Sequence, residues 1–398
     1  MVEQALSNLK VLDLTHRVAG PYCTKLMAGF GAEVIKIERP RGGDKQRDVP
    51  PFADDEHGRE TGLSFMWLNT GKKSVTLDLK HPAGREVATR LTAQSDLVVE
   101  NFSPRVLPGL GLDYETLRQV NPTLVMTSIS NFGQTGPYRD YQADEIILEA
   151  LGGLMQQTGD PARPPLRSGV AVAQYTAGMA AYVASLIALF RRAHTQTGAL
   201  VDVSIHEAVL DNIEISLVEY LRLGRVANRT GDQHVLVPWQ LFPCKDGHAA
   251  IIGGPIRHWL KGACLFEEPR LVQEPYRHIA DRMQRRDEVK ALLEPWLMRN
   301  TKTDIYHQGQ RHRLAFGYLA SLDEVDASPQ LEARQFFTEI DHPLAGPQRY
   351  CGPPFRSSDG PWRSVRAPLL GEHTEEILRD RLHYTDQALA ALREEHVI

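Results

Sequence analysis

Two segments of this chain carry residues that are typical of phosphate-binding loops. Gly71-Lys72-Lys73-Ser74 contains the glycine, lysine and hydroxyl residue that hold phosphates in a P-loop. That motif also needs a leading glycine and a following helix, whereas Met66 stands at the glycine position and a β-rich run follows. The turn at residues 15–21, THRVAGP, has one glycine where a dinucleotide-binding turn needs three. The sequence therefore predicts neither a Walker motif nor NAD binding.

A third segment begins like a metal site. His206-Glu207 starts the pattern of a zinc-protease helix, in which a second histidine follows four residues after the first. Leu210 stands at that place, so we interpret the two residues as a surface or capping pair. The Gly-x-Ser-x-Gly turn of a serine hydrolase does not occur. We therefore expect no metal, and the sequence gives a hydrolase no support.

Charged and amide side chains also mark two expected helix starts. Asp144 and Glu145 are adjacent acids ahead of an apolar run, where the helix dipole stabilises negative charge. Gln174 precedes an apolar helix expected over residues 175–192. A carboxylate would be favoured there by the dipole and by capping, whereas glutamine is uncharged and a poor cap. Local helix stability therefore gives no reason to prefer glutamine at position 174.

The elements that position these residues alternate between strands and helices. Apolar or β-branched runs predict strands over 9–14, 33–38, 74–79, 96–100 and 124–129, with helices over 19–30 and 82–91. The alternation is typical of an α/β fold with a mostly parallel sheet covered by helices. The helix over 175–192 is rich in alanine and glycine, so we expect it to approach a neighbouring element closely. A strand over 200–205 and a helix from His206 follow.

From about residue 225 the sequence has a different character. Short strands and turns such as Asp246-Gly247 appear, followed by a helix over 287–298, and together they predict a second, smaller domain. The Pro/Gly-rich stretch 343–368 is expected to be extended and to return to the first domain or to reach another chain.

Composition and charge exclude several classes of protein. With 398 residues, 42% of them hydrophobic, the chain can bury a large core. Its 45 basic and 50 acidic side chains give a formal charge of -5, so there is no positive field to hold nucleic acid. The four cysteines are scattered without a Cys-x-x-Cys pair, which argues against a zinc site or a disulfide framework and suits a reducing cytoplasm.

No membrane association is expected either. The N-terminal stretch MVEQALSNLK is too polar for a signal peptide. The strongly apolar stretch 176–190 is shorter than the ~20 residues needed to span a bilayer, so we interpret it as part of a buried helix.

Seven segments, in order along nearly the whole chain, together resemble class III CoA-transferases, the family of formyl-CoA transferase, carnitine CoA-transferase and the α-methylacyl-CoA racemases. They are VLDLTHRVAGPYCTKLMAGFGAEVIKIERPRGGDKQR (11–47), LNTGKKSVTLDLK (68–80), LVVENFSPRVLPGLGLDYETL (97–117), SISNFGQTGPY (128–138), ALGGLMQQTGDP (150–161), SPQLEARQFF (328–337) and APLLGEHTEEIL (367–378).

The resemblance implies a fold. The large domain is expected to be Rossmann-like and built from both chain ends, residues 1–224 and 326–398, with a small domain over 225–325 between them. Two such chains are expected to thread through each other as an interlocked dimer, in which the extended C-terminal stretch would contact the partner.

The resemblance also implies a coenzyme A site, with CoA or acyl-CoA as substrate. Its residues are expected to be Arg39, Lys72, Lys73, Asn101 and Phe102, because Arg and Lys can hold phosphates and Phe102 offers an apolar face near the adenine. A basic residue that relatives often carry late in the ENF segment falls on Gly109, and we expect Arg105 to substitute for it.

In the chemistry, this chain departs from the family it resembles. Family transferases use an aspartate, at the position of Gln174, to attack the acyl-CoA thioester, and an amide cannot do this. Formyl-CoA transferase also has a glutamine in its first strand-to-helix turn, where this chain has Val18. The family's acidic helper corresponds to Glu145, and in the racemases a histidine stands at the position of Asp144.

Three hypotheses follow. In the first, the chain is a nucleophile-lacking subunit paired with a homologous chain that keeps the aspartate. Succinyl-CoA:(R)-benzylsuccinate CoA-transferase of anaerobic toluene degradation resembles this arrangement. In the second, it is a stand-alone acyl-CoA lyase, dehydratase, isomerase or racemase-like enzyme that uses Glu145 or Asp144 as a base. In the third, it binds CoA without catalysis, or it is a transferase whose aspartate has been replaced.

Overall fold

The chain folds into two compact units. A computed structural model describes residues 4–54, 56, 58–253, 256–358 and 360–398. Unit 1 comprises Met1–Leu154, Arg167–Arg225 and Glu332–Ile398, and unit 2 comprises Met155–Leu166 and Val226–Leu331. Unit 1 is therefore built from both ends of the chain.

The boundaries differ from the prediction at two segments, and one of them is residues 326–331, which were predicted to lie in the large domain but belong to unit 2. The other, Met155–Leu166, falls inside the predicted large domain, 1–224, but also belongs to unit 2. The backbone N–H of Gly231 donates to the carbonyl of Gly159 at 3.0 Å, and the Arg229 guanidinium donates to the carbonyl of Asp160 at 3.3 Å. Such contacts between residues some 70 positions apart leave no local pattern in the sequence.

Unit 1 contains a six-stranded sheet in the order β3-β2-β1-β4-β5-β6, and each neighbouring pair is parallel. The strands are β1 (Lys10–Asp13), β2 (Glu33–Glu38), β3 (Lys73–Thr76), β4 (Leu97–Glu100), β5 (Val125–Ser130) and β6 (Ala199–Ser204). The chain adds β2 and β3 on one side of β1 and β4 to β6 on the other. This is the doubly wound Rossmann order, so the predicted α/β, Rossmann-like fold is confirmed.

Alternating side chains of the strands feed two separate cores. Val11 and Val99 belong to the core on one face, whereas Leu12 and Val98 belong to the core on the other. This alternation follows from the period of two in a β-strand, and burial on both faces explains why the strands read as continuous apolar runs.

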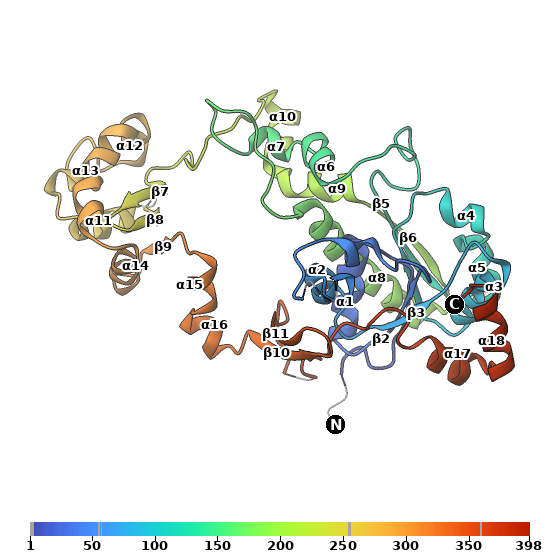
Figure 1. Cartoon of the computed structure of the whole chain (residues 1–398). Coiled ribbons are helices and arrows are strands. Elements are labelled where there is room, and N and C mark those ends of the chain that lie inside the picture. The colour runs from blue at the N-terminus through green and yellow to red at the C-terminus, as the bar shows by residue number, and fades with distance from the viewer. Residues whose placement is uncertain (1–3, 55, 57, 254–255, 359) are drawn as a thin grey trace. The chain divides into compact units, whose positions relative to one another are not determined.

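Helices cover both faces of the sheet (Figure 1). The first core includes residues of α1 (Ala19–Gly29), α6 (Glu145–Leu151), α8 (Val172–Thr195) and α9 (Ile205–Leu210). The second includes residues of α3 (Pro82–Ala93), α4 (Val106–Leu110), α5 (Tyr114–Val120), α17 (Thr374–Leu382) and α18 (Asp386–Glu394). Two further helices of this unit are α2 (Leu63–Leu68) and α10 (Glu214–Leu223).

The alanine-rich helix α8 packs closely on α1, as the sequence predicts. A Cβ atom on Gly178 would lie 2.6 Å from the carbonyl oxygen of Ala19, so glycine is required at this crossing. The helix is longer than the predicted 175–192, and by length and composition it could cross a membrane. Its residues Ala177, Ala181 and Ala188 belong to the first core of unit 1. Val183, Ile187 and Phe190 are exposed, so the helix is buried on one face only, whereas the sequence predicts a helix that is buried throughout.

The C-terminal stretch returns to unit 1 of the same chain. It contains the antiparallel hairpin of β10 (Phe337–His342) and β11 (Gly346–Cys351), of which β11 lies in the predicted extended stretch 343–368. Ile340 and Tyr350 of this hairpin pack with Phe65 of α2. Further along, the N–H of Arg363 donates to the carbonyl of Gly29 at 2.7 Å.

Unit 2 has a small antiparallel sheet in the order β7-β8-β9, with β7 (Trp239–Cys244), β8 (Gly247–Ile252) and β9 (Ala315–Tyr318). Its core includes Trp259, Phe266, Leu293 and Phe316. The helices in or bordering this unit are α7 (Leu154–Gln157), α11 (Ile256–Leu265), α12 (Ile279–Gln284), α13 (Arg286–Arg299), α14 (Lys302–Arg311), α15 (Leu322–Asp326) and α16 (Pro329–Ala333).

Candidate active site

The strand order places a crevice at the carboxyl ends of β1 and β4. The chain turns in opposite directions from these two neighbouring strands, and ligands of doubly wound sheets bind at such a point. Asn101, which follows β4, fixes the turn after β1: the His16 N–H donates to Asn101 Oδ1 at 2.9 Å, and Asn101 Nδ2 donates to the His16 carbonyl at 2.7 Å. Asn101 thus holds the two sides of the crevice together.

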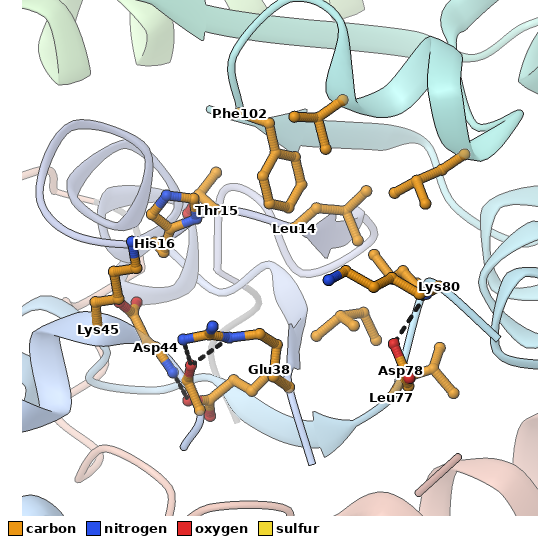
Figure 2. A pocket seen from close by; sticks show the side chains of 16 residues that line it. Leu14, Thr15, His16, Glu38, Asp44, Lys45, Leu77, Asp78, Lys80 and Phe102 are labelled. Atoms are coloured by element: carbon orange, nitrogen blue, oxygen red, sulfur yellow. Dashed lines mark hydrogen bonds between the residues drawn. The ribbon is translucent and has the colours of Figure 1, made fainter. Parts of the chain in front are cut away.

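A first cavity of about 280 Å³ lies on one side of this turn. Its apolar wall includes Leu14 and Phe102, which face each other in Figure 2, and Lys45 and Lys80 lie at opposite sides. Arg39 also lines it, and its guanidinium donates to the Gly43 carbonyl at 3.2 and 3.4 Å. An apolar wall with cations at its edges suits a ligand with an aromatic base and phosphates.

A second cavity of about 500 Å³ lies on the other side of the turn. It shares His16, Lys45 and Phe102 with the first cavity, so the two adjoin. Its wall includes Gln174 and Asp144, which the sequence analysis singled out. An extended ligand could therefore occupy both cavities.

Gln174 is the third residue of α8, because that helix begins at Val172 and not at the predicted residue 175. Its backbone N–H donates to Glu145 Oε2 at 3.2 Å, and the N–H of Ala173 donates to Glu145 Oε1 at 2.7 Å. The carboxylate that caps α8 thus comes from α6. Burial raises the pKa of Glu145, although these two hydrogen bonds oppose the shift.

Asp144 is also engaged in structure. Its Oδ1 accepts the N–H of Glu145 at 2.8 Å, where Asp144 is the N-cap of α6, and its Oδ2 pairs with Arg17 Nη1 at 2.9 Å. Glu145 thus contacts the backbone of Gln174 directly, Asp144 lines the same cavity as Gln174, and each carboxylate accepts at least one backbone N–H group at the start of a helix.

Lys72 does not reach either cavity. Its side chain is fully buried, with Nζ 3.0 Å from Asp13 Oδ2 and 2.8 Å from Asn69 Oδ1. Burial lowers the pKa of Lys72 to about 8, against the attraction of Asp13. The structure thus assigns this lysine to an internal ion pair, and the predicted contact with CoA is not supported.

Lys73 and Arg105 also lie outside the cavity walls. Lys73 pairs with Glu376 at 2.8 Å and lies 3.7 Å from Glu33, the first residue of β2, which places it at the amino ends of the strands. Arg105 binds both carboxylate oxygens of Asp140, at 2.8 and 2.5 Å. Since Asp140 lines the second cavity, Arg105 acts on the site through that carboxylate.

The cavity walls also contain basic residues that the sequence did not indicate as site residues. Lys80 and Lys45 line the first cavity, and Arg17, Lys45 and Arg139 line the second. Their position in the sequence could have indicated two of them. Arg17 follows β1 and Lys80 follows β3, so both lie at the carboxyl ends of the parallel strands.

His16 lies where the two cavities meet. Burial lowers the pKa of His16 to about 4, despite the opposing charge of Asp44, so the imidazole is neutral at pH 7. Its ring centroid lies 5.3 Å from that of Phe102. A neutral ring in this place offers an apolar surface to a passing ligand.

Within the described ranges, no group of three or more His, Cys, Asp or Glu side chains could hold a metal ion. The geometry thus provides two adjoining cavities lined by several cations, and the uncharged amide of Gln174 lines the second of them at the start of α8.

A family model described as CoA-transferase family III matches residues 6–374, a span that contains every residue of both cavities. The chain belongs to CoA-transferase family III. Formyl-CoA:oxalate CoA-transferases of Bradyrhizobium diazoefficiens and Rhodopseudomonas palustris are similar to it, each 34% identical, over 417 and 421 residues. The alignments cover 97% and 98% of this chain and 96% of each relative.

Solved structures of this fold agree with the assignment. A CAIB/BAIF family protein from Brucella suis is 32% identical, with a TM-score of 0.86 over 95% of this chain and 100% of that one. The protein Rv3272 from M. tuberculosis is 25% identical, with a TM-score of 0.84 over 94% of this chain and 99% of that one. The resemblance to class III CoA-transferases is thus confirmed, and a CoA thioester is the substrate that this family implies.

Proposed function

We propose that this chain is the nucleophile-lacking subunit of a heteromeric class III CoA-transferase, which moves CoA from an acyl-CoA such as succinyl-CoA to a carboxylic acid such as benzylsuccinate. The observation that carries the proposal is Gln174, whose uncharged amide lines the second cavity at the start of α8. A homologous partner subunit supplies the catalytic aspartate.

The chemistry explains why a partner is needed. A carboxylate oxygen attacks the thioester carbon, the C–S bond breaks, and CoA leaves as a thiolate. The thiolate then attacks the resulting mixed anhydride, which releases the donor acid and leaves an aspartyl-CoA thioester for the acceptor acid to attack. An amide at position 174 has no carboxylate oxygen to start this sequence.

The two cavities support binding of a CoA thioester on this chain. The first, with Phe102, Arg39 and Lys80, takes the nucleotide end, and the neutral His16 faces the pantetheine chain. The acyl end reaches the second cavity, beside Gln174. Asn101 contributes by holding the turn between them.

Exposed apolar rows support a protein partner. On α8, Val183, Ile187 and Phe190 are spaced along one face and are 47, 64 and 70% exposed. On α10, Val218 and Leu221 are 55 and 70% exposed. Apolar surface of this kind marks an interface, and the proposal places the homologous subunit there in an interlocked arrangement.

The stand-alone lyase, dehydratase, isomerase or racemase-like alternative needs Asp144 or Glu145 as a base. Glu145 accepts two backbone N–H groups of α8, and Asp144 accepts one from α6 and pairs with Arg17. Both carboxylates are committed to these contacts, so the geometry favours the subunit over this alternative.

The proposal includes a cytoplasmic location. All four cysteines are free, two buried and two exposed, which suits a reducing compartment.

Co-expression tests the assembly. The chain is produced with a tagged homologous chain that carries aspartate at the position of Gln174, and we expect the two to co-purify in equal amounts. Ile187→Glu should reduce the yield of the complex, because it places a charge on the exposed face of α8. Leu322→Glu, at an 87% exposed position of α15, is the matched control. A chain that purifies as a homodimer with transferase turnover of its own would exclude the proposal.

A further inference from the structure

We infer that Arg17 is a specificity-determining residue that binds the free carboxylate of a dicarboxylic acyl group carried on CoA. This inference rests on the proposed function only in placing the acyl end of the thioester in the second cavity. Arg17 lines that cavity together with Gln174.

The backbone of Arg17 is held in a conformation that non-glycine residues rarely adopt. Its φ is 65°, in the left-handed region. The N–H of Arg17 donates to Asp44 Oδ1 at 2.9 Å, and the buried Asp44 pairs with the buried Lys36 at 2.9 Å. Strain of this kind persists where the surroundings enforce it, and it gathers at ligand sites. At this position glycine would adopt the backbone conformation without strain, but the chain has an arginine, whose side chain lines the cavity.

The guanidinium of Arg17 has unused donors. Among the described residues its side chain makes one hydrogen bond, from Nη1 to Asp144 Oδ2 at 2.9 Å. A guanidinium carries five N–H donors in a planar fork, so an edge remains for a second carboxylate without breaking the pair with Asp144.

The remaining charges of the cavity favour an anion. Asp140 is neutralised by Arg105, which binds both of its oxygens. Arg139 Nε lies 3.7 Å from Asp140 Oδ1, too far for a hydrogen bond, and it is buried without a hydrogen-bond partner in the described part of the chain. Lys45 forms no ion pair with any described carboxylate. Positive charge therefore exceeds negative charge on this wall.

Further polar atoms of the cavity lack partners. Ser130 Oγ is buried, and no described group makes a hydrogen bond to it. Buried polar atoms are nearly always paired, so an unpaired hydroxyl and an unpaired guanidinium nitrogen in one cavity point to a polar ligand. The volume of about 500 Å³ is within the range of small-ligand sites, so it accommodates a short dicarboxylic acyl group.

Calorimetry on the full chain tests the inference with two thioesters of equal length. Succinyl-CoA carries a free carboxylate and butyryl-CoA does not, so we expect succinyl-CoA to bind about tenfold to a hundredfold more tightly. Arg17→Gly should abolish this preference and leave butyryl-CoA binding unchanged. Glycine suits a φ of 65°, so this variant keeps the turn, and its unfolding midpoint should be no lower than that of the wild type. Arg17→Lys should retain part of the preference for succinyl-CoA, because lysine keeps the positive charge but lacks the planar fork of donors.

The control variant is Arg118→Leu, which removes an exposed arginine of α5 that lines neither cavity. It should leave both affinities unchanged. If Arg17→Gly keeps the full preference, or if the wild type binds both thioesters equally, Arg17 does not recognise the acyl carboxylate. Free succinate that binds as tightly as succinyl-CoA would overturn the assignment to a thioester. If the wild-type chain did not bind CoA at all, the proposed function itself would be contradicted, and not only the role of Arg17.

Discussion

Gln174 and Glu145 meet at the start of α8, and of the two only Glu145 has an ionisable side chain. The sequence predicts Gln174 just ahead of the helix, at a capping position to which glutamine is poorly suited. The helix begins two residues before it, and the cap comes from α6, since Glu145 accepts the N–H groups of Ala173 and Gln174. A cap supplied by another element has no signal in the local sequence.

Replacing Gln174 by aspartate should therefore give little or no transferase activity. Gln174→Asp adds a carboxylate close to that of Glu145, and repulsion between like charges disfavours ionisation of both. The resemblance to formyl-CoA transferase also implies a glutamine in the turn after β1 where this chain has Val18, whose apolar side chain offers no donor to a developing oxyanion. Steady-state assays of the variant alone, with Gln174→Asn as the uncharged control, measure this. Turnover equal to that of a complete complex would mean that the site had lost only its nucleophile.

The two neighbouring lysines of the GKKS segment have different environments. Sequence alone cannot tell which of two adjacent residues at the start of a strand turns inward, because the partner that decides it, Asp13, lies on another strand. Burial by itself would raise the pKa of Asp13, but Lys72, Lys36 and two threonine hydroxyls outweigh it and lower the pKa.

Lys72→Ala should reduce stability more than it affects CoA binding. It removes the lysine that is paired directly with the buried carboxylate of Asp13 and leaves only the more distant charge of Lys36, which costs about 3–5 kcal/mol. Lys73→Ala is the matched control, because its partly exposed ion pairs are worth at most about 1 kcal/mol. Denaturant unfolding of both variants gives the comparison. A stable Lys72→Ala protein with weakened CoA binding would contradict the structural role.

Arg39→Ala should weaken CoA binding by about tenfold to a hundredfold, the effect of losing a charge-assisted hydrogen bond. Arg39 lines the first cavity, whereas Lys73 lies at the opposite ends of the strands, so Lys73→Ala again serves as control. The attraction should decline with added salt, because screening reduces it. Isothermal titration with CoA measures both effects, and equal affinities in Arg39→Ala and the wild type would place the phosphates elsewhere.

At the scale of elements, the sequence predicted the strands of unit 1 well. Residues 33–38 form β2 as predicted, and β1, β4, β5 and β6 begin and end within a residue of the predicted runs, because strands buried on both faces leave continuous apolar sequence. Of the hairpin, only the turn and β11 lie in the stretch 343–368 that the sequence predicts as extended, and β10 has no counterpart in the prediction. The strands of the hairpin alternate weakly in polarity, and their packing on α2 depends on residues more than 250 positions away.

The start of α8 gives an element-scale prediction. Glu145→Ala leaves two N–H groups in the first turn of α8 without acceptors, so it should lower the free energy of unfolding by about 1–2 kcal/mol. The affinity for CoA should not change. Glu145→Gln keeps an acceptor oxygen and should lose less stability. Chemical denaturation of the three proteins gives the order. If both variants kept full stability while a lyase or isomerase activity of the chain disappeared, Glu145 would be a base and not a cap.

At the scale of the whole molecule, the family assignment was available from the order of seven motifs, and the fold followed from it. The assembly could not be predicted in the same way, because the interface of a heteromeric complex depends on two surfaces and this sequence contains only one of them. The exposed row of Val183, Ile187 and Phe190 on α8 is compatible with burial in a complex. What such a complex does chemically depends on which of its chains supplies the nucleophile.

Trapping the covalent intermediate tests that point most directly. The purified complex is incubated with an acyl-CoA donor, treated with hydroxylamine, and mapped by peptide mass spectrometry. Because Gln174 has no carboxylate, we expect the hydroxamate on an aspartate of the partner subunit and none on this chain. A hydroxamate mapped to an acid of this chain, such as Asp144 or Glu145, together with turnover by the chain alone, would contradict the subunit role.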